Sequence, residues 1–154
     1  MRYPALLLIC TLVLPAAVLS ADTKPAKGDK CPVCGMFVSR YPDWLATITF
    51  KNGETVHFDG PKDLFTFYLN MGKYRKGKNP GDIAAITVKD YYGLKSIAAE
   101  KAYFVSGSDV FGPMGKELVP FATDADAAVF NKDHKGSKPL RFNEITPAIL
   151  QRLQ

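Results

Sequence analysis

The sequence of 154 residues contains few of the side chains that most often build zinc sites and enzyme active sites. It has two histidines, His57 and His134, and three cysteines. Neither histidine lies at zinc-finger spacing from a cysteine pair, so a structural zinc site is not expected. The motifs G-x-S-x-G and H-E-x-x-H and the phosphate-binding loop are also missing from the sequence. We therefore do not predict an enzyme.

A strong excess of charge is also missing. Twenty basic and fifteen acidic side chains leave a formal charge of +5, and the basic residues are scattered along the chain. No nucleic-acid-binding motif accompanies them, so a nucleic-acid partner is not expected. The chain is 47% hydrophobic and 12% aromatic, which is enough to form a packed core.

The longest apolar run, residues 5–18, is too short to span a bilayer comfortably. Arg2 precedes it, and Val18 and Ser20 fit the small-residue positions before a cleavage site ahead of Ala21. This pattern predicts a signal peptide over residues 1–20, with an uncleaved N-terminal anchor as the alternative. Cys10 is expected to leave with the signal. We interpret residues 21–29 as a flexible leader and expect a periplasmic protein, with tethering to the membrane left open.

Hydrophobic spacing and turn signals predict an α+β fold made of two packed ββαβ units, 30–90 and 91–154, which share one core. Asn52-Gly53 is typical of a hairpin turn, Pro61 of a helix start, and Gly72 of a helix end. The predicted strands are 44–50, 54–58, 83–88, 102–106, 117–120 and 139–142. The predicted helices follow Pro61, the cap Thr123 and Pro147. Each unit alone would have a marginal core.

The segment Cys31-Pro-Val-Cys34-Gly-Met36 carries the clearest chemistry. Two thiols and a thioether lie within six residues, and soft sulfur ligands favour Cu(I). The spacing alone leaves two alternatives open. A structural disulfide suits an exported chain. A thiol–disulfide redox motif also has C-x-x-C spacing, although Tyr41-Pro42-Asp43 disfavours the long helix that follows such motifs.

Two further residues are candidate ligands. Met114 lies in the predicted turn Phe111-Gly-Pro-Met-Gly115, from which it could reach the cysteine loop; otherwise it covers apolar surface. His57 lies on a predicted strand and should face away from the side of Val56 and Phe58. We interpret His57 as a surface histidine and keep it as a secondary candidate ligand.

Several segments in order resemble the NosL family. They are Cys31-Pro-Val-Cys34-Gly-Met36, Tyr41-Pro-Asp-Trp44, Phe58-Asp-Gly-Pro-Lys-Asp-Leu-Phe65, Ala102-Tyr-Phe-Val-Ser-Gly-Ser108, Gly112-Pro-Met-Gly115, Pro120-Phe-Ala122 and Arg141-Phe-Asn-Glu-Ile145. The resemblance covers residues 29–147 and implies two related ββαβ units.

The resemblance also implies a function and a ligand set. NosL proteins are periplasmic Cu(I)-binding accessory proteins associated with the maturation of nitrous oxide reductase. The implied ligands are Cys34, Met36 and Met114, with Cys31 carried over on weaker grounds. The implied partner is a copper acceptor, either nitrous oxide reductase or its membrane maturation complex. Relatives are often lipoproteins, but this chain has no convincing lipid-attachment site, so a carrier for another copper enzyme stays an alternative.

Overall fold

The computed structural model describes residues 24–154, so the predicted signal peptide and Cys10 lie outside the described residues. The strands are β1 (Ala46–Phe50), β2 (Thr55–Phe58), β3 (Ile83–Lys89), β4 (Ser96–Ala98), β5 (Tyr103–Val105), β6 (Phe111–Gly112), β7 (Gly115–Lys116), β8 (Val119–Phe121) and β9 (Leu140–Arg141). The α-helices are α1 (Pro61–Leu69), α2 (Met71–Tyr74), α3 (Asp124–His134) and α4 (Pro147–Gln151). The α+β prediction is confirmed.

The first sheet is antiparallel, with the strand order β2-β1-β3-β4. The predicted hairpin joins β1 to β2, with Ala46 opposite Phe58. Gly53 has a φ of +86°, which lies in the left-handed region that favours glycine. Its N–H donates to the carbonyl of Phe50 at 2.9 Å. Local turn chemistry therefore fixes the register that places Asp59 just beyond the end of β2.

The second sheet has the strand order β8-β5-β9, and α3 packs against β5 and β8. Thr123 caps the start of α3 as predicted, because its side chain accepts a hydrogen bond from the N–H of Asp126 at 3.1 Å. The helix ends at His134, and Lys135 takes a left-handed conformation with a φ of +56°. A separate hairpin, β6–β7, precedes β8.

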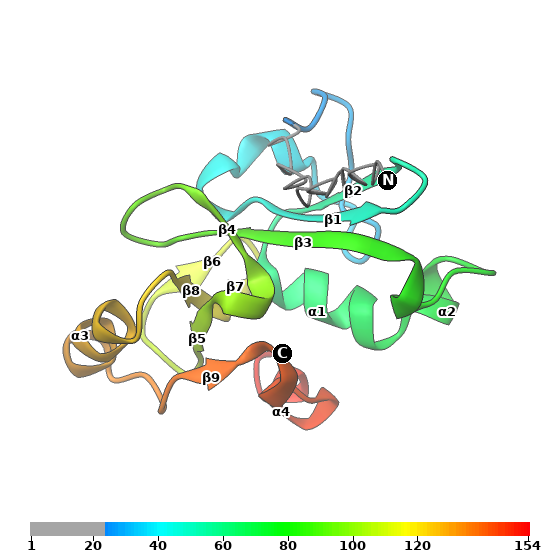
Figure 1. The fold of residues 1–154 in the computed structure, drawn as a ribbon. Coiled ribbons are helices and arrows are strands. Elements are labelled where there is room, and N and C mark those ends of the chain that lie inside the picture. Colours follow the sequence, from blue (N-terminus) through cyan, green and yellow to red (C-terminus); the bar gives the residue numbers. More distant parts are fainter. Residues whose placement is uncertain (1–23) are drawn as a thin grey trace, which may run out of the picture.

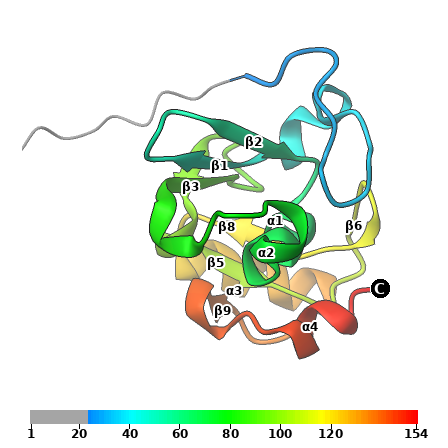
Figure 2. The ribbon, with the colours of Figure 1, turned by 90° about the vertical axis from the view of Figure 1, so that its right-hand side faces the viewer.

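Helix α1 lies between the first sheet and the second half of the chain (Figures 1 and 2). On one side Phe67 packs edge-on against Phe58 of β2, with ring centroids 5.2 Å apart. On the other side Phe65 packs edge-on against Phe104 of β5, also at 5.2 Å. All four rings are fully buried. One hydrophobic cluster thus reaches both sheets, and α1 is held from both sides. A second cluster lies between the second sheet and α3.

The structure differs from the sequence prediction at several short elements. Strand β4 lies in the predicted second unit, yet it pairs with β3 and extends the first sheet. The boundary near residue 90 therefore stays a prediction. Helix α1 ends at Leu69, before Gly72, which lies inside α2. Asn70 interrupts the helix, and its side chain donates to the carbonyl of Thr66 at 2.9 Å. No glycine is needed there.

The end of the predicted leader contacts the domain. The Asp29 carboxylate accepts from the N–H of Ala26 at 2.8 Å, and the Asp29 carbonyl accepts from Val38 at 3.0 Å. These bonds anchor the chain just before the cysteine motif. Within residues 24–154, none of the helices combines the length and the apolar character that crossing a bilayer requires.

Candidate metal centre

The cysteine motif folds into a tight loop. The N–H of Cys31 donates to the carbonyl of Met36, and the N–H of Gly35 donates to the carbonyl of Cys31, both at 2.9 Å. Gly35 has a φ of +80°, which explains the glycine at this position. The backbone N–H groups of Val33 and Cys34 are directed at the Cys31 sulfur, and each acts to lower the pKa of that thiol. The loop thus presents amide donors to its own sulfur atoms.

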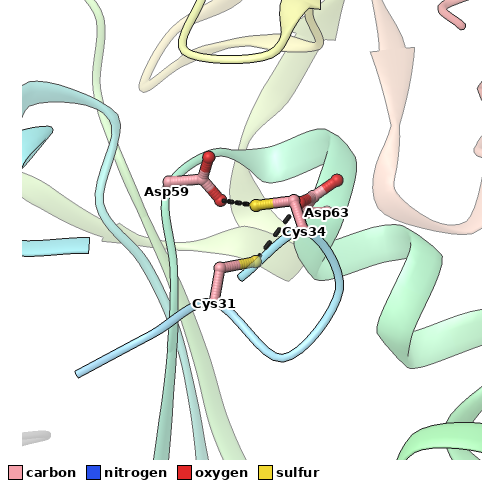
Figure 3. A group of neighbouring side chains, drawn as sticks. All are labelled: Cys31, Cys34, Asp59 and Asp63. Carbon is pink, nitrogen blue, oxygen red and sulfur yellow. Dashed lines mark hydrogen bonds between the residues drawn. The ribbon is translucent and has the colours of Figure 1, made fainter. Parts of the chain in front are cut away.

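Two carboxylates complete the cluster. Asp59 follows β2 and Asp63 lies in the first turn of α1. The Cys31 thiol donates to Asp63 Oδ2 at 3.2 Å, and the Cys34 thiol donates to Asp59 Oδ1 at 3.3 Å (Figure 3). One candidate ligand atom from each of these four residues lies within 4.8 Å of the other three. The four side chains could therefore surround a single ion.

The cluster is poorly hydrated. Cys31 and Asp59 are each 1% exposed, Asp63 is buried and Cys34 is half-buried. Burial raises the pKa of the Cys31 thiol far above its usual range and raises the pKa of Cys34 to about 12; the nearby carboxylates add to both rises. Burial also raises the pKa of Asp63. Without a cation, the thiols therefore keep their protons at neutral pH.

Asp59 gives a second sign that a positive charge fits this cluster. Its Oδ2 atom is buried and has no hydrogen-bond partner in the part of the chain that the structure describes. A buried acceptor without a partner costs about 1–3 kcal/mol. A cation among these side chains would offset that cost and would reverse the electrostatic penalty on the thiolates.

Met114 faces the same region from the second half of the chain. It lies in the β6–β7 connection and is 45% exposed. Cys34, Asp63 and Met114 line one pocket of about 420 Å³. Two predicted ligands that are remote in sequence therefore line the same pocket. Met36 is half-buried on the cysteine loop and does not line this pocket.

Lys62 and Glu117 hold the Met114 hairpin against α1. The buried Lys62 ammonium donates to the carbonyl of Met114 at 2.8 Å and to that of Leu153 at 3.3 Å. Glu117 Oε1 accepts from the N–H groups of Lys62 at 2.5 Å and Leu118 at 2.8 Å. These contacts fix the hairpin beside Asp63 without using any of the four clustered side chains.

His57 lies elsewhere. It is only 8% exposed, and its Nδ1 is 3.0 Å from Thr47 Oγ1. The prediction of a surface histidine is therefore wrong, because the segment that contains Asp29 and Pro32 covers this side of β2. Burial lowers the pKa of His57. The imidazole lines a separate pocket with Asp29 and Arg75, and the structure does not bring it to the thiol cluster.

Sequence reasoning missed both carboxylates. Asp59 directly precedes Gly60, which is the N-cap residue of α1 and has no capping side chain. The spacing of Asp59 and Asp63 is the sequence feature that could have predicted their role. Aspartates four residues apart, across a strand end and a helix start, can both face a loop packed on that junction.

The two cysteines are free thiols in the structure, although a disulfide was an open alternative. Their raised pKa values also differ from those of redox-active cysteines, whose thiolates are stabilised at neutral pH. The fold and this cluster define an α+β protein with a compact thiol–carboxylate site suited to a metal ion.

The comparisons place this protein more narrowly. Residues 22–150 match the NosL family, so the chain belongs to that family, as the resemblance predicts. The copper-binding lipoprotein NosL of Stutzerimonas stutzeri is 30% identical over 131 residues. That alignment covers 80% of this chain and 65% of the lipoprotein, so the chain spans just under two thirds of that relative's length.

Two solved structures share the fold. The crystal structure of the copper chaperone NosL from Shewanella denitrificans has a TM-score of 0.70 and 26% identity, and the match covers 83% of this chain and 97% of that chain. The solution structure of apo-NosL from Achromobacter cycloclastes has a TM-score of 0.50 and 27% identity, with coverage of 68% and 87%.

Proposed function

We propose that this protein is a periplasmic, non-enzymatic carrier that binds Cu(I) and passes it to a copper acceptor. The observation that carries the proposal is that Cys34 and Met114 line one pocket, while Cys31 lies beside Cys34. Two relatives are described as a copper-binding lipoprotein and as a copper chaperone, which supports copper as the cargo.

Sulfur chemistry decides which of the clustered atoms hold the ion. Thiolates and thioethers suit Cu(I), whereas carboxylates suit harder cations. The proposed ligands are therefore Cys31, Cys34 and Met114, with Met36 as a further sulfur donor on the same loop. His57 receives no ligand role, because it lines a different pocket.

Asp59 and Asp63 then serve as proton acceptors. Each receives a thiol hydrogen bond in the cluster. When Cu(I) binds, each thiol loses its proton, and the carboxylates provide a route for those protons to leave. When copper departs, two protons return to the two thiolates. Cargo release is thus coupled to proton uptake.

The pocket also suggests a direction of transfer. Met114 is the most exposed of the proposed ligands, so an acceptor protein can reach it most easily. A neutral thioether also binds Cu(I) more weakly than a thiolate does. Acceptor ligands approaching from the hairpin side would replace Met114 first and the buried Cys31 last. We propose that the acceptor is nitrous oxide reductase or its membrane maturation complex; another copper enzyme is the alternative.

The test is anaerobic titration of the reduced protein with Cu(I) in competition with a chromophoric Cu(I) chelator. We expect one tightly bound ion per chain. Cys34→Ser should lower the affinity by about a hundredfold or more, because it replaces a soft thiolate with a hard hydroxyl. His57→Gln is the matched control and should bind copper as the parent does. Unchanged affinity in Cys34→Ser would remove the proposal.

Delivery needs a separate measurement. Copper should pass from the loaded protein to copper-free nitrous oxide reductase faster than it passes from the Cu(I)–chelator complex to the same enzyme. The redox alternative predicts instead that the reduced protein catalyses insulin reduction, which we do not expect for thiols with raised pKa values.

A further inference from the structure

The segment Tyr41-Pro-Asp-Trp44 has no role in the copper site. Asp43 and Trp44 lie in a short 3-10 helix, Pro42–Trp44, and line a second pocket of about 440 Å³. Tyr91 and Tyr92, from the β3–β4 connection, and Phe111 of β6 line the same pocket. This size is within the range of pockets that take small ligands or single side chains, roughly 300–1,000 Å³.

The pocket is unusually rich in aromatic faces. The rings of Trp44 and Tyr91 are 6.0 Å apart and tilted by 52°, and those of Tyr91 and Tyr92 are 5.5 Å apart and tilted by 58°. Tyr92 is 48% exposed and Phe111 is 63% exposed. Neighbouring rings therefore stand at an angle to one another around an accessible space. The faces of such rings carry partial negative charge.

Full negative charge adds to this partial charge, although the whole chain is positive at +5. The exposed Asp43 side chain has no ion pair or hydrogen bond with any residue in 24–154. On the other side, loss of hydration and then the charges of Asp133 and Asp126 raise the pKa of the Tyr92 phenol. Among the described residues that line the pocket, Asp43 alone carries a formal charge, and that charge is negative.

No cation of the described chain occupies these rings. The cation–π pairs recorded within residues 24–154 involve other rings, namely Phe37, Phe50, Tyr74 and Tyr103. Tyr91 and Tyr92 also pack against the buried rings of Phe121 and Phe130. The exposed part of Tyr92 and the exposed Asp43 carboxylate line the space that a cation from outside can enter.

We propose that this pocket binds the guanidinium group of an arginine side chain on a protein partner. A guanidinium is flat, stacks on aromatic faces and bonds to a carboxylate through two parallel N–H groups, whereas an ammonium offers neither the plane nor the fork. Trp44, Tyr91 and Tyr92 supply the faces, and Asp43 supplies the carboxylate. The inference stands independently of copper binding.

The aromatic pocket lies on the same hairpin as the copper pocket, which suggests how it could serve copper transfer. Phe111 and Met114 lie on one hairpin, with Phe111 lining the aromatic pocket and Met114 lining the copper pocket. A partner whose arginine occupies the aromatic pocket would lie beside the exposed side of the copper pocket. The site is therefore suited to orient a partner.

The chain's single tryptophan makes the test direct, because all tryptophan emission comes from Trp44. The purified protein is titrated with N-acetyl-arginine amide and, separately, with N-acetyl-citrulline amide, which is neutral and nearly the same shape. We expect a saturable change in emission with the arginine compound, and affinity at least about tenfold lower for citrulline. No saturable response, or equal binding of both compounds, would overturn the proposal.

Variants locate the binding. Asp43→Asn and Tyr92→Leu should each weaken arginine binding by about fivefold. Glu100→Gln, which removes an exposed carboxylate away from the pocket, and Tyr92→Phe, which keeps the ring, should bind as the parent does. Circular dichroism checks that each variant is folded. If Asp43→Asn and Tyr92→Leu both bind normally, or if tetramethylammonium binds more tightly than the arginine compound, the assignment is wrong.

Discussion

Met114 and Met71 allow the sulfur proposal to be tested one residue at a time. Met114 is 45% exposed at the pocket, whereas Met71 is 4% exposed in the core. Met114→Leu keeps the size and apolar character but removes the thioether, so Cu(I) affinity should fall by about tenfold or more with little change in stability. Met71→Leu should leave the affinity unchanged, and chelator competition measures both. Equal affinities for the two variants would exclude Met114 as a ligand.

The thiol protons predict a steep pH dependence of copper binding. Cys34 has a pKa raised to about 12 and that of Cys31 is raised further, so both thiols are protonated near neutral pH. Each proton that copper displaces makes the affinity rise by about tenfold per pH unit, and two give about a hundredfold. Competition titrations between about pH 6 and 8 measure the slope. In Cys34→Ser the slope of log affinity against pH should be half that of the parent. An affinity that does not change with pH would contradict binding by two thiolates.

The sequence predicts the sulfur donors of the proposed copper site, but it does not predict the two carboxylates of the cluster. Cys31 and Cys34 are recognisable because their spacing is local, and Met114 because a turn and a family resemblance both mark it. Asp59 and Asp63 carry no such mark, since an aspartate near a helix start is expected for capping alone. The burial of His57 depends on a covering segment that strand alternation cannot predict.

At the level of elements, Glu117 connects the start of α1 to the segment between β7 and β8. It is 3% exposed, and burial raises its pKa from 4.5 to about 8, against the lowering effect of the N–H groups of Leu118 and Lys62. Between these two values the folded protein keeps a proton that the unfolded chain releases. The free energy of unfolding should therefore fall as pH rises from about 4.5 to 8, by up to about 1.4 kcal/mol per unit.

Glu117→Gln tests this prediction. The amide oxygen can still accept from the two N–H groups, but the side chain no longer titrates, so the pH slope should largely disappear. Urea unfolding of the metal-free, reduced protein at several pH values measures it. Glu100→Gln, at an exposed position, should keep the parent slope. A slope that persists in Glu117→Gln would assign the dependence to other groups.

Elements with strong turn, cap or hydrophobic signals follow from the sequence, including the short strands β5, β8 and β9, but several other short elements do not. The β1–β2 hairpin and α3 have strong turn and cap signals, and the structure contains both. Strands β4, β6 and β7 have two or three residues each, which is too few for an alternating pattern to be distinguished. Tertiary pairing creates these strands, and that information lies outside the local sequence.

At the level of the whole molecule, the shared core predicts that damage in the second sheet weakens the first. Phe104 of β5 is fully buried against Phe65 of α1. Phe104→Ala should lower the free energy of unfolding by about 3–5 kcal/mol. If the two sheets unfold together, hydrogen exchange of the β1 amides should accelerate by the same free energy. Val129→Ala, on the exposed face of α3, is the control; unchanged protection in β1 would show separate units.

The meeting of Cys34 and Met114 has a consequence for how long the molecule survives in its compartment. A copper ion held by both would connect the start of the described chain to its second half, and it would stabilise the folded state because it binds that state and not the unfolded chain. Protease sensitivity would then report cargo. Molecules that have given up their copper would be digested sooner than those still carrying it.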